Sequence, residues 1–227
     1  MGKEEQIKTK IFQSAINYVR ENHAQAIDSA YTYYWDEQQP DEVMGGVCLE
    51  LGFINFEDWL IFDYKANDKN ETFLTIYGRV DSGLGPEELA VIGKIKDSIL
   101  SLYEVASVAR DKRVLLRDLL LGDEIRLRDK SLTRGLQKGD IFATRLLNLD
   151  GNYVMSGCVY PYSSDQKKQV LRKIESQFGR YVRNVKPGGT MRDYLKDYGD
   201  IFNIIWMHFI IDPEASDEGM PPGPDGL

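Results

Sequence analysis

The middle of the chain changes its hydrophobic period from that of a helix to that of a strand. In the segment that begins at Pro86, apolar residues recur every three to four positions, which is typical of a helix with one buried face. From Tyr103 onward, apolar and polar residues alternate instead, which is typical of half-buried strands. One short strand cannot bury its apolar face alone. The pattern therefore predicts several strands that pair with one another between Tyr103 and Tyr160.

Five alternating segments follow one another in this stretch, separated by turn signals. They cover residues 103–109, 112–118, 123–129, 141–147 and 152–160. Asp150-Gly151 is a hairpin signal because both residue types tolerate positive φ. Five short strands with short connections predict a small barrel. The expected fold class is α+β, in which helical N- and C-terminal regions are packed with a central five-stranded antiparallel small barrel.

Helical spacing dominates on both sides of the expected barrel. Asn55 is a good N-cap, and Pro86 suits the first turn of another helix. Ser164 and Thr190 are expected to begin helices after the barrel, whereas Pro, Gly and acids dominate from Asp212. The expected organisation is a mainly helical region over 1–102, a barrel-like segment over 103–161, C-terminal helices over 162–211 and a disordered acidic tail over 212–227.

The chain is acidic overall but locally basic in the barrel segment. Its net charge of −8 at pH 7 argues against wholesale wrapping of nucleic acid. From Arg110 to Arg145, however, ten Lys or Arg residues stand against six Asp or Glu. We therefore expect a basic module inside an acidic protein.

Alternation places arginines on one outward face of the second and third strands. The candidate anion-binding residues are Arg113, Arg117, Arg126, Arg128 and, nearby, Arg134. Like charges on neighbouring strands are unfavourable without partners, and a phosphate backbone would supply such partners. The alternative is that acids of the protein itself, among them Asp118, Glu124 and Asp129, pair with these arginines.

Catalytic, metal-binding and nucleotide-binding signatures are missing from the sequence. His23 and His208 are the only histidines, and His208 is expected to be a hydrogen-bonded core residue. Cys48 and Cys158 lack a neighbouring base, so both are expected to fill the core. Catalytic residues stay unassigned, and no metal, cofactor or specific small-molecule ligand is expected. A hydrolytic enzyme that uses carboxylates, with or without a metal, is the alternative reading.

Sequence features also predict a cytoplasmic location without a membrane segment. Two isolated cysteines fit a reducing compartment, and the first residues lack the apolar stretch of a signal peptide. The longest apolar run, 204–211, is far too short to cross a membrane.

Several short motifs occur in a fixed order between Asn55 and Tyr160. They are the aromatic-rich stretch 56–64, the Pro-Glu-Glu helix that ends in 101–105, the segment 114–122, Ser131-Leu132-Thr133-Arg134, and Gly139-Asp140 with Ala143-Thr144-Arg145. In these motifs the chain resembles a family of uncharacterised bacterial proteins. Many relatives in that family carry a C-terminal zinc-binding SEC-C motif, whose Cys cluster is absent here. The resemblance therefore implies an architecture but neither an activity nor a zinc site.

These observations together favour a non-enzymatic interaction module. Its barrel would contact a protein partner or an anionic polymer such as RNA. The locally basic arginine face favours the polymer, and the acidic charge of the whole chain favours internal pairing.

Overall fold

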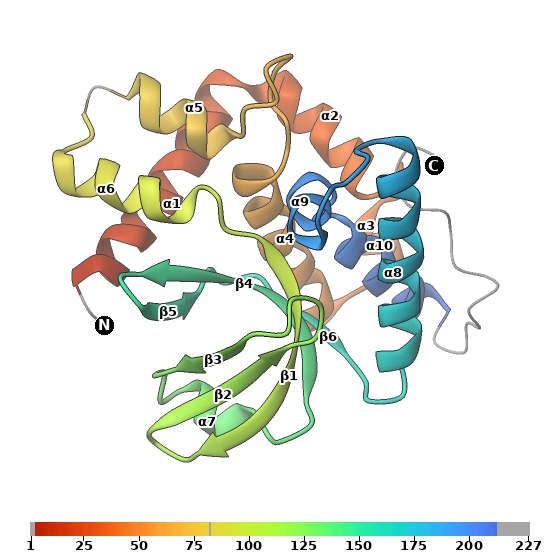
Figure 1. The fold of residues 1–227 in the computed structure, drawn as a ribbon. Coiled ribbons are helices and arrows are strands. Elements are labelled where there is room, and N and C mark those ends of the chain that lie inside the picture. The colour runs from red at the N-terminus through yellow and green to blue at the C-terminus, as the bar shows by residue number, and fades with distance from the viewer. Residues whose placement is uncertain (1–2, 82, 213–227) are drawn as a thin grey trace. The chain divides into compact units, whose positions relative to one another are not determined.

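The computed structural model describes residues 3–81 and 83–212 (Figure 1). The chain divides into two compact units, which we call the helical unit (Met1–Ser98 with Leu146–Gly157) and the barrel unit (Ile99–Arg145 with Cys158–Leu227). Residues 213–227, which hold most of the expected acidic tail, lie outside the described residues.

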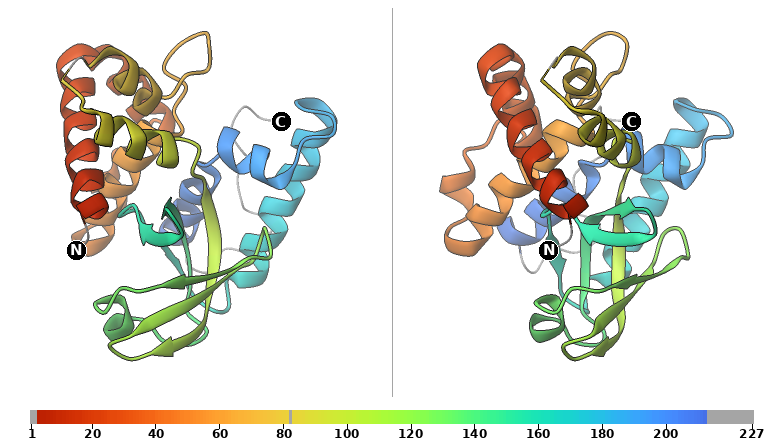
Figure 2. Two further views of the ribbon diagram at one scale, coloured as in Figure 1. Left: turned by 60° about the vertical axis from the view of Figure 1, so that its left-hand side comes forward. Right: turned by 90° about the vertical axis from the view of Figure 1, so that its left-hand side faces the viewer.

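Helices make up most of the helical unit. They are α1 (Lys3–Asn22), α2 (Ala24–Tyr34), α3 (Pro40–Val43), α4 (Gly46–Phe62), α5 (Phe73–Val80) and α6 (Pro86–Ile95). α1 lies against α2, α4, α5 and α6 (Figure 2). Ile11, Ala15 and Val19 are buried and spaced by four residues, so they form the apolar stripe that α1 packs into this unit.

Helix α4 is longer than the sequence pattern predicts. It begins at Gly46, and Asn55 is fully buried in its interior rather than being an N-cap. The segment from Phe56 to Phe62 is almost entirely buried. Because packing surrounds this part of the helix, burial overrides the local preference of asparagine for a cap. The expected start of α6 at Pro86 is confirmed, and the Glu88 side chain accepts a hydrogen bond from the Gly85 N–H at 2.7 Å.

The barrel unit combines strands with C-terminal helices. Its elements are β1 (Leu100–Ala109), β2 (Arg113–Asp118), β3 (Glu124–Leu127), α7 (Leu132–Gly135), the first half of β4 (Ile141–Leu149), β6 (Tyr160–Tyr162), α8 (Lys167–Asn184), α9 (Met191–Asp197) and α10 (Ile201–Ile211). The second half of β4 and β5 (Asn152–Met155) form a hairpin in the helical unit. At its turn Asp150 and Gly151 have φ of 50° and 85°, as the hairpin signal predicts.

The strands form one sheet in the order β1-β2-β3-β5-β4-β6, and an additional pairing of β1 with β4 closes five of them into a barrel. β1 is antiparallel to β2 and β4, β2 is antiparallel to β3, and β4 is antiparallel to β5. It follows that β3 and β5, which are neighbours in the sheet order, run in the same direction. The expectation of a purely antiparallel barrel is therefore wrong, because closing a sheet with an odd number of strands brings two parallel strands together.

Strand boundaries differ from the sequence-based prediction at both ends of the barrel segment. β1 begins at Leu100, within a stretch expected to be helical, and Leu100 lies opposite Arg145 of β4. The expected fifth strand is divided into β5 and β6. Gly157, with φ of 136°, lies between them, and this conformation favours glycine. β6 then pairs with the start of β4, whereas β5 pairs with its end.

The C-terminal helices follow the predicted caps only in part. Thr190 and Asp193 form the expected capping box: Asp193 N–H donates to Thr190 Oγ1 at 3.1 Å and Thr190 N–H donates to Asp193 Oδ2 at 2.8 Å. The single helix expected after Thr190 is instead two helices, α9 and α10, with Gly199 between them.

Candidate functional site

Strands β2 and β3 present the predicted arginines to solvent. Val114 and Leu116 are fully buried, whereas Arg113 and Arg117 on the same strand are exposed. On β3, Leu127 is buried and Arg126 is exposed. The register places Leu115 opposite Arg126 and Arg117 opposite Glu124, so the exposed side chains of both strands share one face.

Arg117 is neutralised on this face by neighbouring acids. Its guanidinium lies 3.3 Å from Glu124 Oε1 on β3. Glu104 of β1 is opposite Arg117 in register and accepts a hydrogen bond from Lys167 Nζ at 2.9 Å. Positive and negative side chains thus alternate along this row of the sheet, which leaves little charge for a ligand.

Arg134 is neutralised as well, at the turn between β1 and β2. It belongs to α7 and donates from Nε and one terminal nitrogen to Asp111 Oδ1, at 3.1 and 2.9 Å. Asp111 N–H donates to Thr133 Oγ1 at 2.9 Å. These bonds hold α7 on the β1–β2 turn and remove Arg134 from the set of available cations.

Three of the predicted arginines keep their charge available. Arg113, Arg126 and Arg128 are exposed, and none forms an ion pair with a carboxylate of residues 3–81 or 83–212. Val114 lies opposite Leu127, so Arg113 and Arg128 occupy the next pair of positions. Like charges at such positions repel unless an anion lies between them.

Three further exposed cations stand close to these arginines in the sequence. Arg110 and Lys112 lie in the β1–β2 turn, and Lys130 follows Arg128 on the way to α7. We call Arg110, Lys112, Arg113, Arg126, Arg128 and Lys130 the strand-end cluster. Alternation along the strands did not single out Arg110, Lys112 and Lys130 as candidates. The excess of Lys and Arg in residues 110–145 was the signal for them.

Two of the three acids proposed as internal partners are committed to other bonds. Asp118 is 2% exposed, and its Oδ1 accepts hydrogen bonds from Ser101 Oγ at 2.8 Å and from the N–H groups of Leu120 and Leu121, each at 2.9 Å. Asp129 Oδ1 accepts from Ser131 N–H and Oγ, at 2.7 and 2.5 Å. Burial alone would raise the pKa of Asp129, but these hydrogen bonds outweigh it and lower that pKa. Of the three acids proposed as internal partners, only Glu124 pairs with a predicted arginine.

A second set of cations lies along α8. Val170, Ile174 and Tyr181 are its buried side, and Lys168, Arg172 and Arg183 are exposed. Lys168 and Arg183 have no carboxylate partner in the described part of the chain. The outward side of α8 is therefore basic as well.

His208 and Cys48 are placed differently from the sequence expectations. His208 is half-buried on α10, burial lowers its pKa, and its Nε2 has no hydrogen-bond partner among the described residues. The expectation of a hydrogen-bonded core histidine is thus wrong at this nitrogen. Cys158 is buried as expected, but Cys48 is exposed on α4, because the N-terminal half of that helix faces solvent.

Acid clusters suited to metal-dependent chemistry are not found in residues 3–81 and 83–212. In those ranges no group of three or more His, Cys, Asp or Glu side chains is arranged to hold a metal ion. Of the paired acids in the sequence, Glu57 contacts Arg20 at 2.5 Å, and Glu87 and Glu88 contact Lys3 and Lys10, each at 2.6 Å.

Across the described ranges, no helix combines the length and the apolar character that a bilayer span requires.

Comparisons with known proteins give one family and no characterised relative. Residues 51–184, more than half of the chain, match a family of unknown function, DUF7986. No curated protein and no solved structure matches the chain. The match covers β1 to β4 and all six residues of the strand-end cluster. The chain therefore belongs to the family of unknown function DUF7986.

Proposed function

We propose that this protein is a non-enzymatic binding module whose strand-end cluster contacts an anionic polymer, with the phosphate backbone of RNA as the chemical class. The observation that carries the proposal is the exposure of Arg113, Arg126 and Arg128 without carboxylate partners among the described residues. Neighbouring arginines of the same sheet are neutralised by Glu124 and Asp111. The unpaired charge is thus concentrated at one end of the strands.

Phosphate fits this cluster better than a single carboxylate does. Each guanidinium offers several N–H donors in a plane and binds phosphate oxygens in pairs. Six cations at one strand end match a chain of regularly spaced anions, and polymer binding gains free energy from the counterions that it releases. β2 and β3 contain no aromatic residue, so stacking on bases would contribute nothing there. Contact with the backbone, independent of base sequence, is the mode that this surface supports.

The basic side of α8 extends the same proposal. Lys168 and Arg183 are exposed and without carboxylate partners in the described ranges. α8 belongs to the barrel unit, and Lys167 at its start is bonded to Glu104 of β1. A polymer that follows the sheet toward Glu104 would therefore meet the first turn of this helix.

We also propose that this protein acts in a bacterial cytoplasm. A bacterial cytoplasm is supported by the family resemblance in the sequence motifs and by two cysteines that are not joined.

The alternative function is that of a carboxylate-dependent hydrolase. Residues 3–81 and 83–212 contain no group of three or more His, Cys, Asp or Glu side chains that could hold a metal ion for it. The resemblance to relatives with SEC-C motifs implies no zinc site in this chain, because the chain has only two cysteines.

The test compares two pairs of arginines that carry the same charge. Arg126→Ser with Arg128→Ser removes unpaired cations, and Arg117→Ser with Arg134→Ser removes neutralised ones. Binding of a short polyuridylate RNA is measured by fluorescence anisotropy from about 50 mM salt upward, where phosphate contacts are strong. We expect the first pair to weaken binding by about tenfold or more, since a charge-assisted hydrogen bond is worth about 1.5–3 kcal/mol. It should also reduce the slope of log K against log salt by about 1.4, or about 0.7 for each lost contact.

The control pair, Arg117→Ser with Arg134→Ser, should change the RNA affinity and the salt slope much less, although both double variants have the same net charge. Equal losses for the two pairs would mean that overall charge, not the strand-end cluster, governs binding. A wild-type protein without affinity for RNA at about 50 mM salt, but with one defined protein retained in a pull-down, would replace the polymer by a protein partner.

A further inference from the structure

A groove of about 160 Å³ lies between three helices of the helical unit, α1, α2 and α4. Its walls are mostly apolar or aromatic and come from Ile16, Ile27, Tyr31, Phe53, Phe56 and Leu60. The rings of Tyr31 and Phe56 pack edge to face, with their centroids 5.6 Å apart. A cavity of about 150 Å³ with apolar walls can hold a benzene ring. The groove therefore has room for one aromatic or branched aliphatic side chain.

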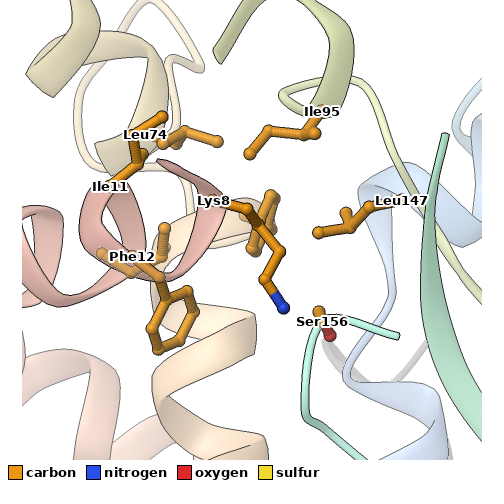
Figure 3. A pocket seen from close by; sticks show the side chains of 9 residues that line it. Lys8, Ile11, Phe12, Leu74, Ile95, Leu147 and Ser156 are labelled. Carbon is orange, nitrogen blue, oxygen red and sulfur yellow. The ribbon is translucent and has the colours of Figure 1, made fainter. Parts of the chain in front are cut away.

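The cavity beside Lys8 in the same unit is far smaller. Its volume is about 10 Å³, which is close to the least that a single water molecule needs. Apolar side chains from α1, α5, α6 and β4 close around it (Figure 3), so it has no room for a side chain of a partner. The groove differs because Phe53, one of its walls, is 41% exposed, which opens the groove to solvent.

Exposed apolar side chains continue from the groove along the N-terminal half of α4. Ile54 is 44% exposed and Val47 is 70% exposed. These two residues are seven positions apart, which is about 10 Å along a helix, and they lie on the same side of it. A ligand of the size of one ring would leave them uncovered. Apolar side chains gathered in this way mark a surface for a larger partner.

The surface around the groove is acidic. Residues 21–64 include ten Asp or Glu and no Lys or Arg. Glu50 is exposed and lies one turn before Phe53 on α4. Asp41 of α3 is exposed as well, and it acts on Tyr31 in the lining: burial raises the pKa of the Tyr31 hydroxyl, and the Asp41 carboxylate raises it further. Carboxylates thus stand at the groove on two elements.

Arg20 is the one cation of the lining, and it is neutralised. Its guanidinium lies 2.5 Å from Glu57 Oε1. Glu50 and Asp41, in contrast, pair with no cation of residues 3–81 or 83–212. The charge left at the groove is therefore negative, which repels a phosphate backbone and attracts a basic partner.

Helices alone form the walls of the groove. The backbone N–H and C=O groups within a helix bond to one another, so these walls offer no strand edge to which an extended peptide could add. Recognition then depends on side chains. An amphipathic helix binds in this way, because its apolar side chains at spacings of three, four and seven residues enter a groove together.

We propose that the groove between α1, α2 and α4 is a docking site for a cationic amphipathic helix of a partner protein. One aromatic or leucine side chain of that helix fills the groove next to Phe53, and apolar side chains on its next turns cover Ile54 and Val47. Its Lys or Arg residues face Glu50 and Asp41. The site lies in the helical unit, whereas the strand-end cluster lies in the barrel unit, so this inference does not depend on binding of RNA.

The test uses the full-length protein and a synthetic helix of Leu and Lys with a single central Phe. The peptide is about 18 residues long, because shorter isolated helices are marginal, and its apolar residues lie on one side. A peptide of the same composition in scrambled order is the control for charge alone. Dissociation constants are measured by fluorescence anisotropy of the labelled peptides. We expect the amphipathic peptide to bind at least about tenfold more tightly than the scrambled one.

Two apolar variants of equal kind locate the binding surface. Phe53→Ser removes a wall of the groove and should weaken binding of the amphipathic peptide by about tenfold or more, as loss of a central apolar contact does. Leu89→Ser is the matched control, because Leu89 is 44% exposed on α6 of the same unit and does not line the groove. Circular dichroism and the melting temperature check that each variant is folded. Ile54→Ser, at an equally exposed position of α4, tests the same surface if Phe53→Ser unfolds.

Two double charge variants test the acidic surroundings. Glu50→Gln with Asp41→Asn should weaken binding by about threefold or more at about 50 mM salt, and by less at about 0.5 M salt, where surface charges are screened. Asp68→Asn with Asp123→Asn removes two exposed carboxylates that lie outside α2, α3 and α4. This control pair should change the affinity much less, although both variants have the same net charge.

Several outcomes would overturn the proposal. They are the absence of saturable binding up to about 1 mM peptide, equal affinity for the scrambled peptide, equal losses for Phe53→Ser and Leu89→Ser, and equal losses for the two charge pairs. Sedimentation of the protein alone provides a further check. A dimer that Phe53→Ser converts to a monomer would assign the groove to a second copy of this chain instead of a basic partner.

Discussion

The two units of the molecule use their acidic side chains in different ways. In the helical unit, acids pair with exposed cations: Lys3 with Glu87, Lys10 with Glu88, Arg20 with Glu57, and Lys94 with Asp150. The barrel unit contains such pairs too, among them Arg117 with Glu124 and Arg134 with Asp111. Its Asp118 and Asp129, however, bond to backbone N–H groups and hydroxyl groups instead. These four cations of the helical unit are therefore neutralised, whereas the barrel unit keeps a set of cations that its own acids do not cover.

This difference shows that an acidic protein can retain a cationic site. The net charge of −8 describes the whole chain, whereas binding depends on the charges within about 10 Å of the ligand at 0.1 M salt. Exposed ion pairs of the kind seen in the helical unit are worth only about 0–1 kcal/mol. Their main effect is to remove attraction for other anions. Four predictions, from the largest effect to the smallest, test this comparison.

Asp118→Ala should cause the largest loss of stability, about 2–3 kcal/mol, because it leaves the buried Ser101 hydroxyl and two backbone N–H groups without their acceptor. Urea unfolding measures this free energy. Asp118→Asn keeps one oxygen acceptor and should lose less. If Asp118→Ala were as stable as the wild type, the view that this acid is reserved for the fold would be wrong. RNA affinity of the folded variant should not change.

Glu124→Gln should convert a neutralised arginine into an available one. Arg117 loses its partner on β3, so the affinity for polyuridylate should rise severalfold, and the salt slope should steepen by about 0.7 for one added contact. Glu57→Gln in the helical unit releases Arg20 in the same way and is the matched control. A similar gain in both variants would show that the position of the freed cation does not matter.

A smaller effect concerns titration of an acid in the helical unit. The hydrogen bond from Lys10, together with one from the Gly85 N–H, lowers the pKa of Glu88 below its ordinary value of 4.5. Its pairing thus contributes stability above that value, and the contribution is lost as pH falls through the lower pKa of the folded state. Carboxyl-carbon NMR should show the Glu88 midpoint below 4.5, and Lys10→Gln should raise it. An unchanged midpoint in this variant would contradict the pairing.

Binding by the strand-end cluster should, in contrast, be insensitive to mild acid. Arginine stays protonated throughout, and none of these cations is paired with a described carboxylate that could titrate. RNA affinity at about pH 5.5 should therefore match that at about pH 7.5, a range in which histidine alone changes charge without perturbation.

The side chains that face outward on the strands could be predicted from the sequence alone. Alternation with a period of two separates Val114 and Leu116 from Arg113 and Arg117 whatever the strands pair with, and the structure confirms that separation. Local signals also located the hairpin at Asp150-Gly151 and the capping box at Thr190. These features depend on neighbouring residues along the chain, so a single sequence contains the information for them.

Neutralisation of particular arginines depends instead on contacts between segments that are distant in the sequence. Glu124 reaches Arg117 because of the β2–β3 register, and Asp111 reaches Arg134 because α7 folds back on the β1–β2 turn. A small cavity in the helical unit joins residues as distant in sequence as Lys8 and Ser156. The same kind of long-range packing buried Asn55 inside α4 and put two parallel strands into the barrel. Such contacts depend on how separated segments meet, and no local pattern of residues encodes that.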